Sequence, residues 1–137
     1  MRRFHQAKLE KQDKVIVWGS GTPRREFLHV DDLASACLYL MNLDVSEYRK
    51  HTKPALSHIN VSAGDEISIH DLAHLIARVV GFKGEIVFDR SKPDGTPKRP
   101  LDITKLNNLG WQPGITLEQG LKDTYNWFLE NIDSIRK

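Results

Sequence analysis

Short apolar runs bounded by turn residues indicate strands at three places in the chain. Residues 15–18 (VIVW) end at a glycine, residues 57–61 (SHINV) alternate between polar and apolar, and residues 85–89 (EIVFD) form another short run. Residues 26–30 also alternate and are compatible with a brief paired segment. These patterns are typical of strands, and the run at 15–18 predicts a buried one.

Apolar residues at helical spacing predict a helix that begins at Asp31 or Asp32 and ends near Leu43. Either aspartate is suited to the N-cap, because a carboxylate accepts hydrogen bonds from the free N–H groups of the first turn. The expected core positions of this helix are Leu33, Ala36, Cys37, Leu40 and Met41. We therefore expect the helix to bury one face.

Two capping boxes predict the other long helices. Ser68 with Asp71 opens an amphipathic helix that ends before a glycine at residue 81. Thr116 with Gln119 opens the last helix, expected from about 117 to 133 and placed over the core from outside.

The order of these elements predicts an α/β fold. Strands and helices alternate as β-α-β-α-β, residues 2–14 form a helix-friendly segment, and Asp102 is expected to cap a short helix ending at Leu109. A chain of 137 residues has the size of one domain. We expect one compact unit over residues 1–137, with helices packed on a small mixed sheet.

Composition and charge argue against several classes of protein. The net charge of +2 is spread along the chain, and the three tryptophans are far apart, unlike the basic stripe with aromatic platforms of a nucleic-acid binder. No stretch approaches the ~20 apolar residues that span a bilayer, and no apolar run follows the basic start. The single cysteine, Cys37, cannot form an internal disulfide. We expect a cytoplasmic protein.

Arginine and lysine in two shaped loops are the candidate phosphate ligands. Arg25 follows the turn GSGTP, and Lys98 and Arg99 end the proline-rich segment 90–100 (RSKPDGTPKRP). A guanidinium offers five donors in a planar fork that matches phosphate oxygens, and lysine adds a point charge. The alternative is that all three are solvated surface charges.

Two further residues next to these cations have a binding and a structural interpretation. Trp18 can stack on a base or ribose, or it can belong to the core. Asp94 lies in a Pro-Asp-Gly turn, where it can accept a hydrogen bond from a ligand or serve its own backbone. The residues alone favour the structural interpretation for both.

The sequence contains only weak signals for a metal site, a reactive thiol or a dinucleotide-binding site. His70 and His74 are four residues apart but lack the acidic residue of a zinc motif. Cys37 on an apolar helix face is typical of a small hydrophobe. The sequence Gly19-Ser20-Gly21 has no third glycine opening a helix, so it predicts a turn rather than a dinucleotide fingerprint.

Several blocks of the sequence together resemble one enzyme family. The blocks are VWGSGTPRREFLHVDDLA, LSHINVSAG, VVGFKGEIVFD, SKPDGTPKRPLD and LGWQPGITLEQGLKDTYNWFLEN. In this order they are similar to the carboxyl-terminal half of the GDP-L-fucose synthase family, within the extended short-chain dehydrogenase/reductase superfamily. The resemblance covers essentially the whole chain. It implies the substrate-binding part of such an enzyme, with the amino-terminal NADP-binding domain missing.

The resemblance also implies a reaction and a set of contacts. Members of the family take GDP-4-keto-6-deoxy-D-mannose, epimerise it at C3 and C5, and reduce C4 with NADPH, usually as homodimers. The positions that match the family's GDP-sugar contacts are Arg3, Trp18, Arg25, Asp94 and Arg99. Arg99 stands where lysine is common, which keeps the charge but changes the donor geometry.

The chain departs from the family in lacking its catalytic signatures. It contains no glycine-rich strand-turn-helix fingerprint and no Tyr-x-x-x-Lys, the pair that serves the hydride step in the family. The family's epimerisation cysteine and histidine also belong to the missing part, so Cys37 receives no catalytic role. The resemblance thus implies that this polypeptide alone is inactive and needs no cofactor.

Two alternatives remain open from the sequence. One is the substrate domain of another nucleotide-sugar epimerase or dehydratase, and the other is a non-catalytic nucleotide-binding module.

Overall fold

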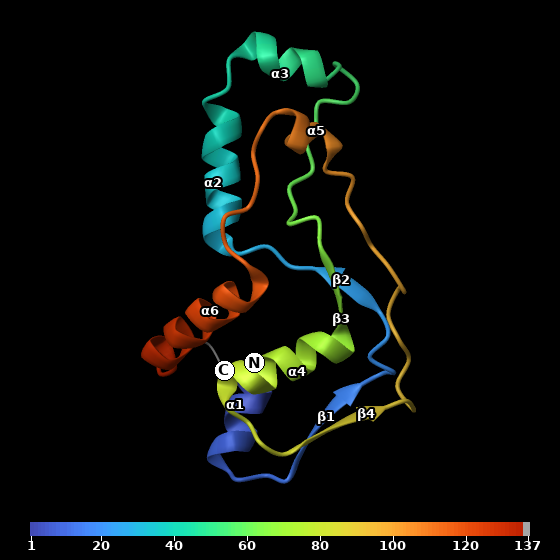
Figure 1. Ribbon diagram of the computed structural model, residues 1–137, viewed down its shortest axis with the longest axis vertical. Helices are drawn as coiled ribbons and strands as arrows, with labels where there is room; N and C mark the ends of the chain where they lie inside the picture. The colour runs from blue at the N-terminus through green and yellow to red at the C-terminus, as the bar shows by residue number, and fades with distance from the viewer. Residues whose placement is uncertain (136–137) are drawn as a thin grey trace.

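The computed structural model describes residues 1–135, which form an elongated α/β molecule (Figure 1). Its elements in chain order are α1 (Arg2–Leu9), β1 (Lys14–Trp18), β2 (Arg24–Glu26), α2 (Val30–Met41), α3 (Val45–His51), β3 (Glu66–Ser68), α4 (Ile69–Val80), β4 (Glu85–Asp89), α5 (Thr104–Asn108) and α6 (Leu117–Asn131). The expected α/β class is confirmed. No helix within the described range is long and apolar enough to cross a membrane.

The strands form two separate pairs rather than the single mixed sheet expected. β1 and β4 are parallel, with Lys14 opposite Glu85. β2 and β3 are antiparallel, with Glu26 opposite Glu66. Residues 19–23, the glycine turn, separate the pairs because Gly19 and Gly21 take φ values of +88° and +81° and redirect the chain after β1.

The strand at residues 15–18 is confirmed, but its burial differs from the expectation. Val15 is buried, whereas Ile16 and Trp18 on the opposite face of β1 are exposed. A strand alternates its side chains between two faces, so only one face of β1 meets the core. The next strand, Arg24–Glu26, begins two residues before the expected segment 26–30 and overlaps it only at Glu26.

Both capping boxes are confirmed at the N-termini of their helices. The Ser68 hydroxyl accepts the N–H of Asp71 at 3.0 Å to begin α4. The Thr116 hydroxyl accepts the N–H of Gln119 at 3.3 Å to begin α6. Gly81 ends α4 in the left-handed conformation that the sequence signal predicts.

The predicted cap of α2 is wrong, because His29 is the N-cap and its Nδ1 accepts the N–H of Asp31. Asp32 is 6% exposed, and its carboxylate accepts the N–H groups of Gly114 and Ile115 at 3.0 Å each. These bonds turn the Asp32 side of the helix toward residues 111–115. The expected core face is right only in part: Ala36 is fully buried and Leu40 is partly buried, but Leu33, Cys37 and Met41 are exposed.

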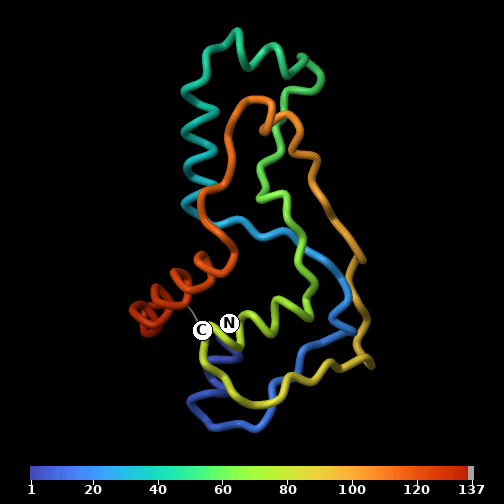
Figure 2. Tube along the Cα trace, in the orientation of Figure 1, coloured from blue at the N-terminus to red at the C-terminus, as the bar shows by residue number. Residues whose placement is uncertain are grey.

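The predicted strand at residues 57–61 is also wrong, since this segment is irregular (Figure 2). Backbone carbonyls in and next to this segment accept hydrogen bonds from side chains rather than from a neighbouring strand. The Tyr48 hydroxyl donates to Ser57 O, and Lys105 Nζ donates to Leu56 O and to His58 O. Polar–apolar alternation is therefore not sufficient to predict strand pairing here.

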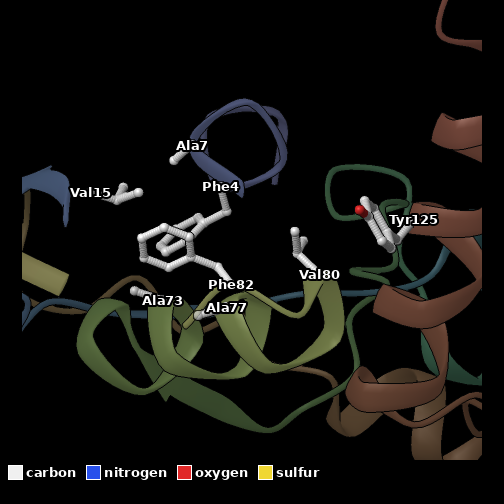
Figure 3. Close-up of a cluster of buried hydrophobic side chains, with 8 residues drawn as sticks. All are labelled: Phe4, Ala7, Val15, Ala73, Ala77, Val80, Phe82 and Tyr125. Atoms are coloured by element: carbon white, nitrogen blue, oxygen red, sulfur yellow. The ribbon is translucent and has the colours of Figure 1, made fainter. Parts of the chain in front are cut away.

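Two hydrophobic clusters form the core of the described chain. The larger one joins α1, β1, α4 and α6 and comprises Phe4, Ala7, Val15, Ala73, Ala77, Val80, Phe82 and Tyr125 (Figure 3). The smaller one lies between α2 and α5 and consists of Ala36, Leu106 and Trp111. The expected single unit is thus built on two centres of packing that share no buried residue.

Candidate functional site

The glycine turn and residues 90–100, the basic loop, are joined by Ser20 and Asp94. Asp94 Oδ1 accepts the Ser20 N–H at 2.7 Å, and Oδ2 accepts the Ser20 hydroxyl at 2.6 Å. A Cβ at Gly19 would lie 2.3 Å from Asp94 Oδ1, so this approach requires glycine. The Ser20 hydroxyl, followed by the Ser20 N–H, lowers the pKa of Asp94.

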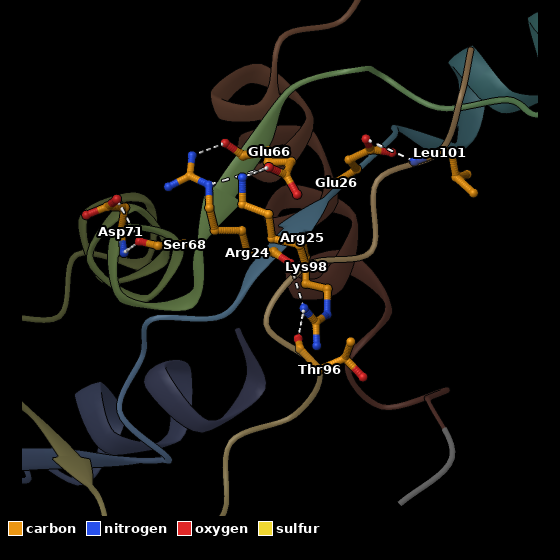
Figure 4. A network of polar contacts seen from close by, with 9 residues as sticks. All are labelled: Arg24, Arg25, Glu26, Glu66, Ser68, Asp71, Thr96, Lys98 and Leu101. Atoms are coloured by element: carbon orange, nitrogen blue, oxygen red, sulfur yellow. Dashed lines mark hydrogen bonds and ion pairs between the residues drawn. The ribbon is translucent and has the colours of Figure 1, made fainter.

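Arg25 holds the next part of the basic loop against β2. Its Nη1 donates to Thr96 O at 2.8 Å and to Arg24 O at 2.6 Å (Figure 4). The backbone N–H of Arg24 donates to Pro97 O at 2.9 Å. The guanidinium of Arg25 is thereby oriented by the backbone of the loop and remains partly accessible.

Trp18 and Arg3 line an open hollow of about 660 Å³ along β1, together with the acidic residues Asp13 and Asp89. Trp18 is 66% exposed, so the core interpretation of this residue is wrong. Lys92 Nζ lies 5.8 Å from the Trp18 ring centroid, within cation–π range. Arg3 Nη1 donates to Ile16 O at 2.7 Å, which places its guanidinium next to β1.

The structure brings four of the five candidates into one region. Trp18 precedes the turn residue bonded to Asp94, Arg25 bonds the loop two residues beyond Asp94, and Arg3 shares the hollow with Trp18. Arg99 lies at the far end of the basic loop and is exposed. The arrangement presents cations and an exposed indole on adjoining segments, a combination suited to an aromatic or sugar group linked to phosphates.

Residues 19–21 do not fit the pyrophosphate of a dinucleotide. In a dinucleotide site the glycine turn opens a helix whose N–H groups face the phosphates. Here the turn leads into β2, and the Ser20 N–H already donates to the Asp94 carboxylate, whose charge would repel a phosphate. Among residues 1–135 no three metal-ligating side chains gather at one point either.

Sequence reasoning missed two residues that shape this region. Ser20 binds Asp94 from 74 residues away, and Glu66 of β3 lies 3.5 Å from Lys98 Nζ. A serine between two glycines was visible as part of the turn, but its partner depends on how the loop folds back. Glu66 has no local signal, because only the β2–β3 pairing brings it to the loop.

The chain is similar in sequence and fold to enzymes that act on nucleotide sugars. Residues 1–53 match the sequence model of the NAD dependent epimerase/dehydratase family. The chain is 55% identical over 136 residues to GDP-L-fucose synthase of Escherichia coli (strain K12). This alignment covers 99% of this chain and 42% of that protein. A putative GDP-L-fucose synthase 2 of Arabidopsis thaliana is 53% identical, over 96% of this chain and 38% of that protein.

Solved structures agree with the sequence relatives. A GDP-L-fucose synthetase from Naegleria fowleri bound to NADP aligns with a TM-score of 0.84 and 31% identity, covering 99% of this chain and 40% of that one. The GDP-mannoheptose C4 reductase of Campylobacter jejuni with NADP bound aligns with a TM-score of 0.79 and 35% identity, over 93% and 42% of the two chains. The chain is thus a homologue of the GDP-L-fucose synthases over essentially its whole length, and it spans about two fifths of the length of these relatives.

Proposed function

We propose that the chain is the GDP-sugar-binding portion of a GDP-L-fucose synthase, which converts GDP-4-keto-6-deoxy-D-mannose to GDP-L-fucose. The observation that carries the proposal is the double hydrogen bond between Ser20 and Asp94, which fixes the basic loop beside Trp18 and Arg25. The 55% identity to a GDP-L-fucose synthase supports the same assignment.

Each candidate residue has a role suited to its chemistry. Arg3, Arg25 and Arg99 bind the diphosphate, since guanidinium groups pair with phosphate oxygens two at a time. Trp18 offers a flat apolar face to the base or the sugar. Asp94 accepts a polar hydrogen of the ligand, because each carboxylate oxygen has a second acceptor site beyond its bond to Ser20.

Catalysis in this proposal depends on residues outside this chain. The family's hydride pair Tyr-x-x-x-Lys does not occur in the sequence, and the glycine turn does not fit a dinucleotide. A separate amino-terminal domain would bind NADPH, and the intact enzyme would be a cytoplasmic homodimer. The 137-residue polypeptide is then inactive, and turnover of the keto-sugar with NADPH, free of any longer contaminant, would refute this part.

A nucleotide titration tests the proposal directly. GDP is added to the isotope-labelled chain while its amide spectrum is recorded, with Arg25→Ala as the control variant. We expect shifts near Trp18, Arg25 and Asp94 that the variant loses. The absence of shifts at millimolar GDP would contradict nucleotide binding by this part of the protein.

Competition distinguishes the nucleotide. We expect UDP and dTDP to displace GDP poorly. Preference for UDP would instead favour a different epimerase, a class represented by the UDP-glucose 4-epimerase of Thermotoga maritima, which aligns at 26% identity with a TM-score of 0.71.

A further inference from the structure

Glu66 connects β2, β3 and the basic loop, although it is not among the proposed ligand contacts. Its Oε2 lies 3.5 Å from Lys98 Nζ and 3.7 Å from Arg24 Nε (Figure 4). The Glu66 side chain is 17% exposed, whereas that of Lys98 is 64% exposed. One half-buried carboxylate therefore faces cations from two different segments.

The pairing of β2 with β3 explains why Glu66 needs these cations. Glu66 stands directly opposite Glu26 in the ladder, and like charges in opposite positions repel. Glu26 is compensated by the Ser62 hydroxyl and by the N–H of Leu101, at the carboxyl side of the loop. Glu66 is compensated by Arg24 and Lys98, so both glutamates bind the segment that crosses β2.

Lys98 and Arg99 are adjacent in sequence but differ in their surroundings. The charge of Lys98 is engaged by Glu66. Arg99 is exposed and makes no ion pair or side-chain hydrogen bond with any residue between 1 and 135. A cation that is already neutralised contributes less to an incoming anion than one that faces only solvent.

We propose that Glu66 is a positioning residue of the GDP site, which holds Lys98 and Arg24, fixes the basic loop across β2 and leaves Arg99 and Arg25 to bind the diphosphate. The inference rests on the function proposed above. It assigns Lys98 to the loop tether rather than to the ligand.

Amide exchange tests the tether without any ligand. In the 137-residue chain the Arg24 N–H is protected by Pro97 O. Glu66→Gln removes the attraction for both Lys98 and Arg24, and we expect this amide to exchange about fivefold faster, the range expected for loss of a solvent-accessible ion pair. Glu118→Gln is the control matched in charge, because it removes one carboxylate whose ion pair, with Lys122, lies within α6 and does not involve the loop. Equal exchange rates in wild type and Glu66→Gln would overturn the tether.

Nucleotide binding tests the positioning role. Glu66→Gln should weaken GDP binding about threefold, although it removes a negative charge. It should also lower the ratio of GDP affinity to GMP affinity. Glu66→Asp keeps the carboxylate, so it should restore part of the GDP affinity and part of this ratio. Lys98→Met should change GDP affinity no more than Glu66→Gln does, whereas Arg99→Met should weaken it about tenfold.

The outcomes separate this inference from the proposed function. Tighter GDP binding by Glu66→Gln, or an equal loss in Lys98→Met and Arg99→Met, would overturn the positioning role while leaving GDP recognition intact. If the wild-type chain binds no GDP, the positioning role fails together with the proposed function, and the exchange rate of Arg24 still decides whether Glu66 tethers the loop.

Discussion

Ser20 and Asp94 show how much of the site depends on single polar contacts between distant residues. The sequence presents Asp94 as a turn residue and Ser20 as a spacer between glycines. In the structure both carboxylate oxygens of Asp94 accept hydrogen bonds from Ser20. Neither the turn interpretation nor the ligand interpretation anticipated this partner, because a contact across 74 residues has no local pattern. Trp18 is the opposite case: its exposure removes the structural alternative that the sequence favoured.

The titration of Asp94 provides a prediction at this scale. The Ser20 hydroxyl is the largest cause of the lowered pKa of Asp94, and the Ser20 N–H is the second. Ser20→Ala removes the first cause and keeps the second, so the pKa of Asp94 should rise toward the ordinary value of 3.8. The carboxyl-carbon chemical shift of Asp94, followed against pH, measures this.

The same shift sets the sign of a pH effect on the loop. Because the folded pKa is lowered, the carboxylate stabilises the folded state fully above the ordinary aspartate pKa, and this contribution is lost as the pH falls through the folded pKa. Asp89 is an internal control, since Ser91 lowers its pKa in the same way and Ser20→Ala should leave it unchanged. An unchanged Asp94 titration in Ser20→Ala would contradict the assignment.

Elements whose signals are local could be predicted, and those that depend on a distant partner could not. The capping box at Ser68, the C-cap at Gly81 and strand β4 (Glu85–Asp89) follow from neighbouring residues, and all are confirmed. The prediction of Asp32 as a cap is wrong because its carboxylate accepts hydrogen bonds from the N–H groups of residues 114 and 115 instead. The predicted strand at residues 57–61 is wrong because the carbonyls of residues 57 and 58 accept hydrogen bonds from side chains rather than from a neighbouring strand. The glycine turn was predicted, but not its contact with the basic loop.

The glycine turn yields a prediction at the scale of elements. Gly21 has φ +81°, and a Cβ there would lie 2.7 Å from a ring carbon of Phe88 on β4 and 3.1 Å from Cβ of His70 on α4. Gly21→Ala combines backbone strain with a clash, so it should lower the free energy of unfolding by about 3 kcal/mol. Denaturant unfolding measures the change. Gly114→Ala is the control: its Cβ would meet only Asp32 Oδ1, at 3.8 Å, and its cost should stay within about 0.5 kcal/mol. Equal stability of the two variants would show that the turn tolerates a side chain.

At the scale of the whole molecule, the two hydrophobic clusters are unequal. The larger cluster packs α1 and α6 against α4, and the ring of Phe4 meets the edge of Phe82 at a centroid distance of 5.7 Å. The smaller cluster has three buried residues, and α3 beside it buries none. A region with few buried apolar contacts can open locally, at a free energy below that of global unfolding. The region of α2, α3 and α5 should therefore exchange its amides faster than α4.

Removing Leu106 tests whether the two clusters unfold independently. Leu106 is 1% exposed, and Leu106→Ala should cost the smaller cluster about 3 kcal/mol. If this cluster opens on its own, hydrogen exchange in α2 and α5 should accelerate more than tenfold in the variant while α4 keeps its wild-type rates. Val80→Ala, at an equally buried position in the larger cluster, should accelerate α4. Equal acceleration of α4 and α5 in Leu106→Ala would mean that one cooperative unit spans both clusters. Independent opening would leave the glycine turn unaffected, because Phe88 and His70, which pack at Gly21, belong to elements of the larger cluster.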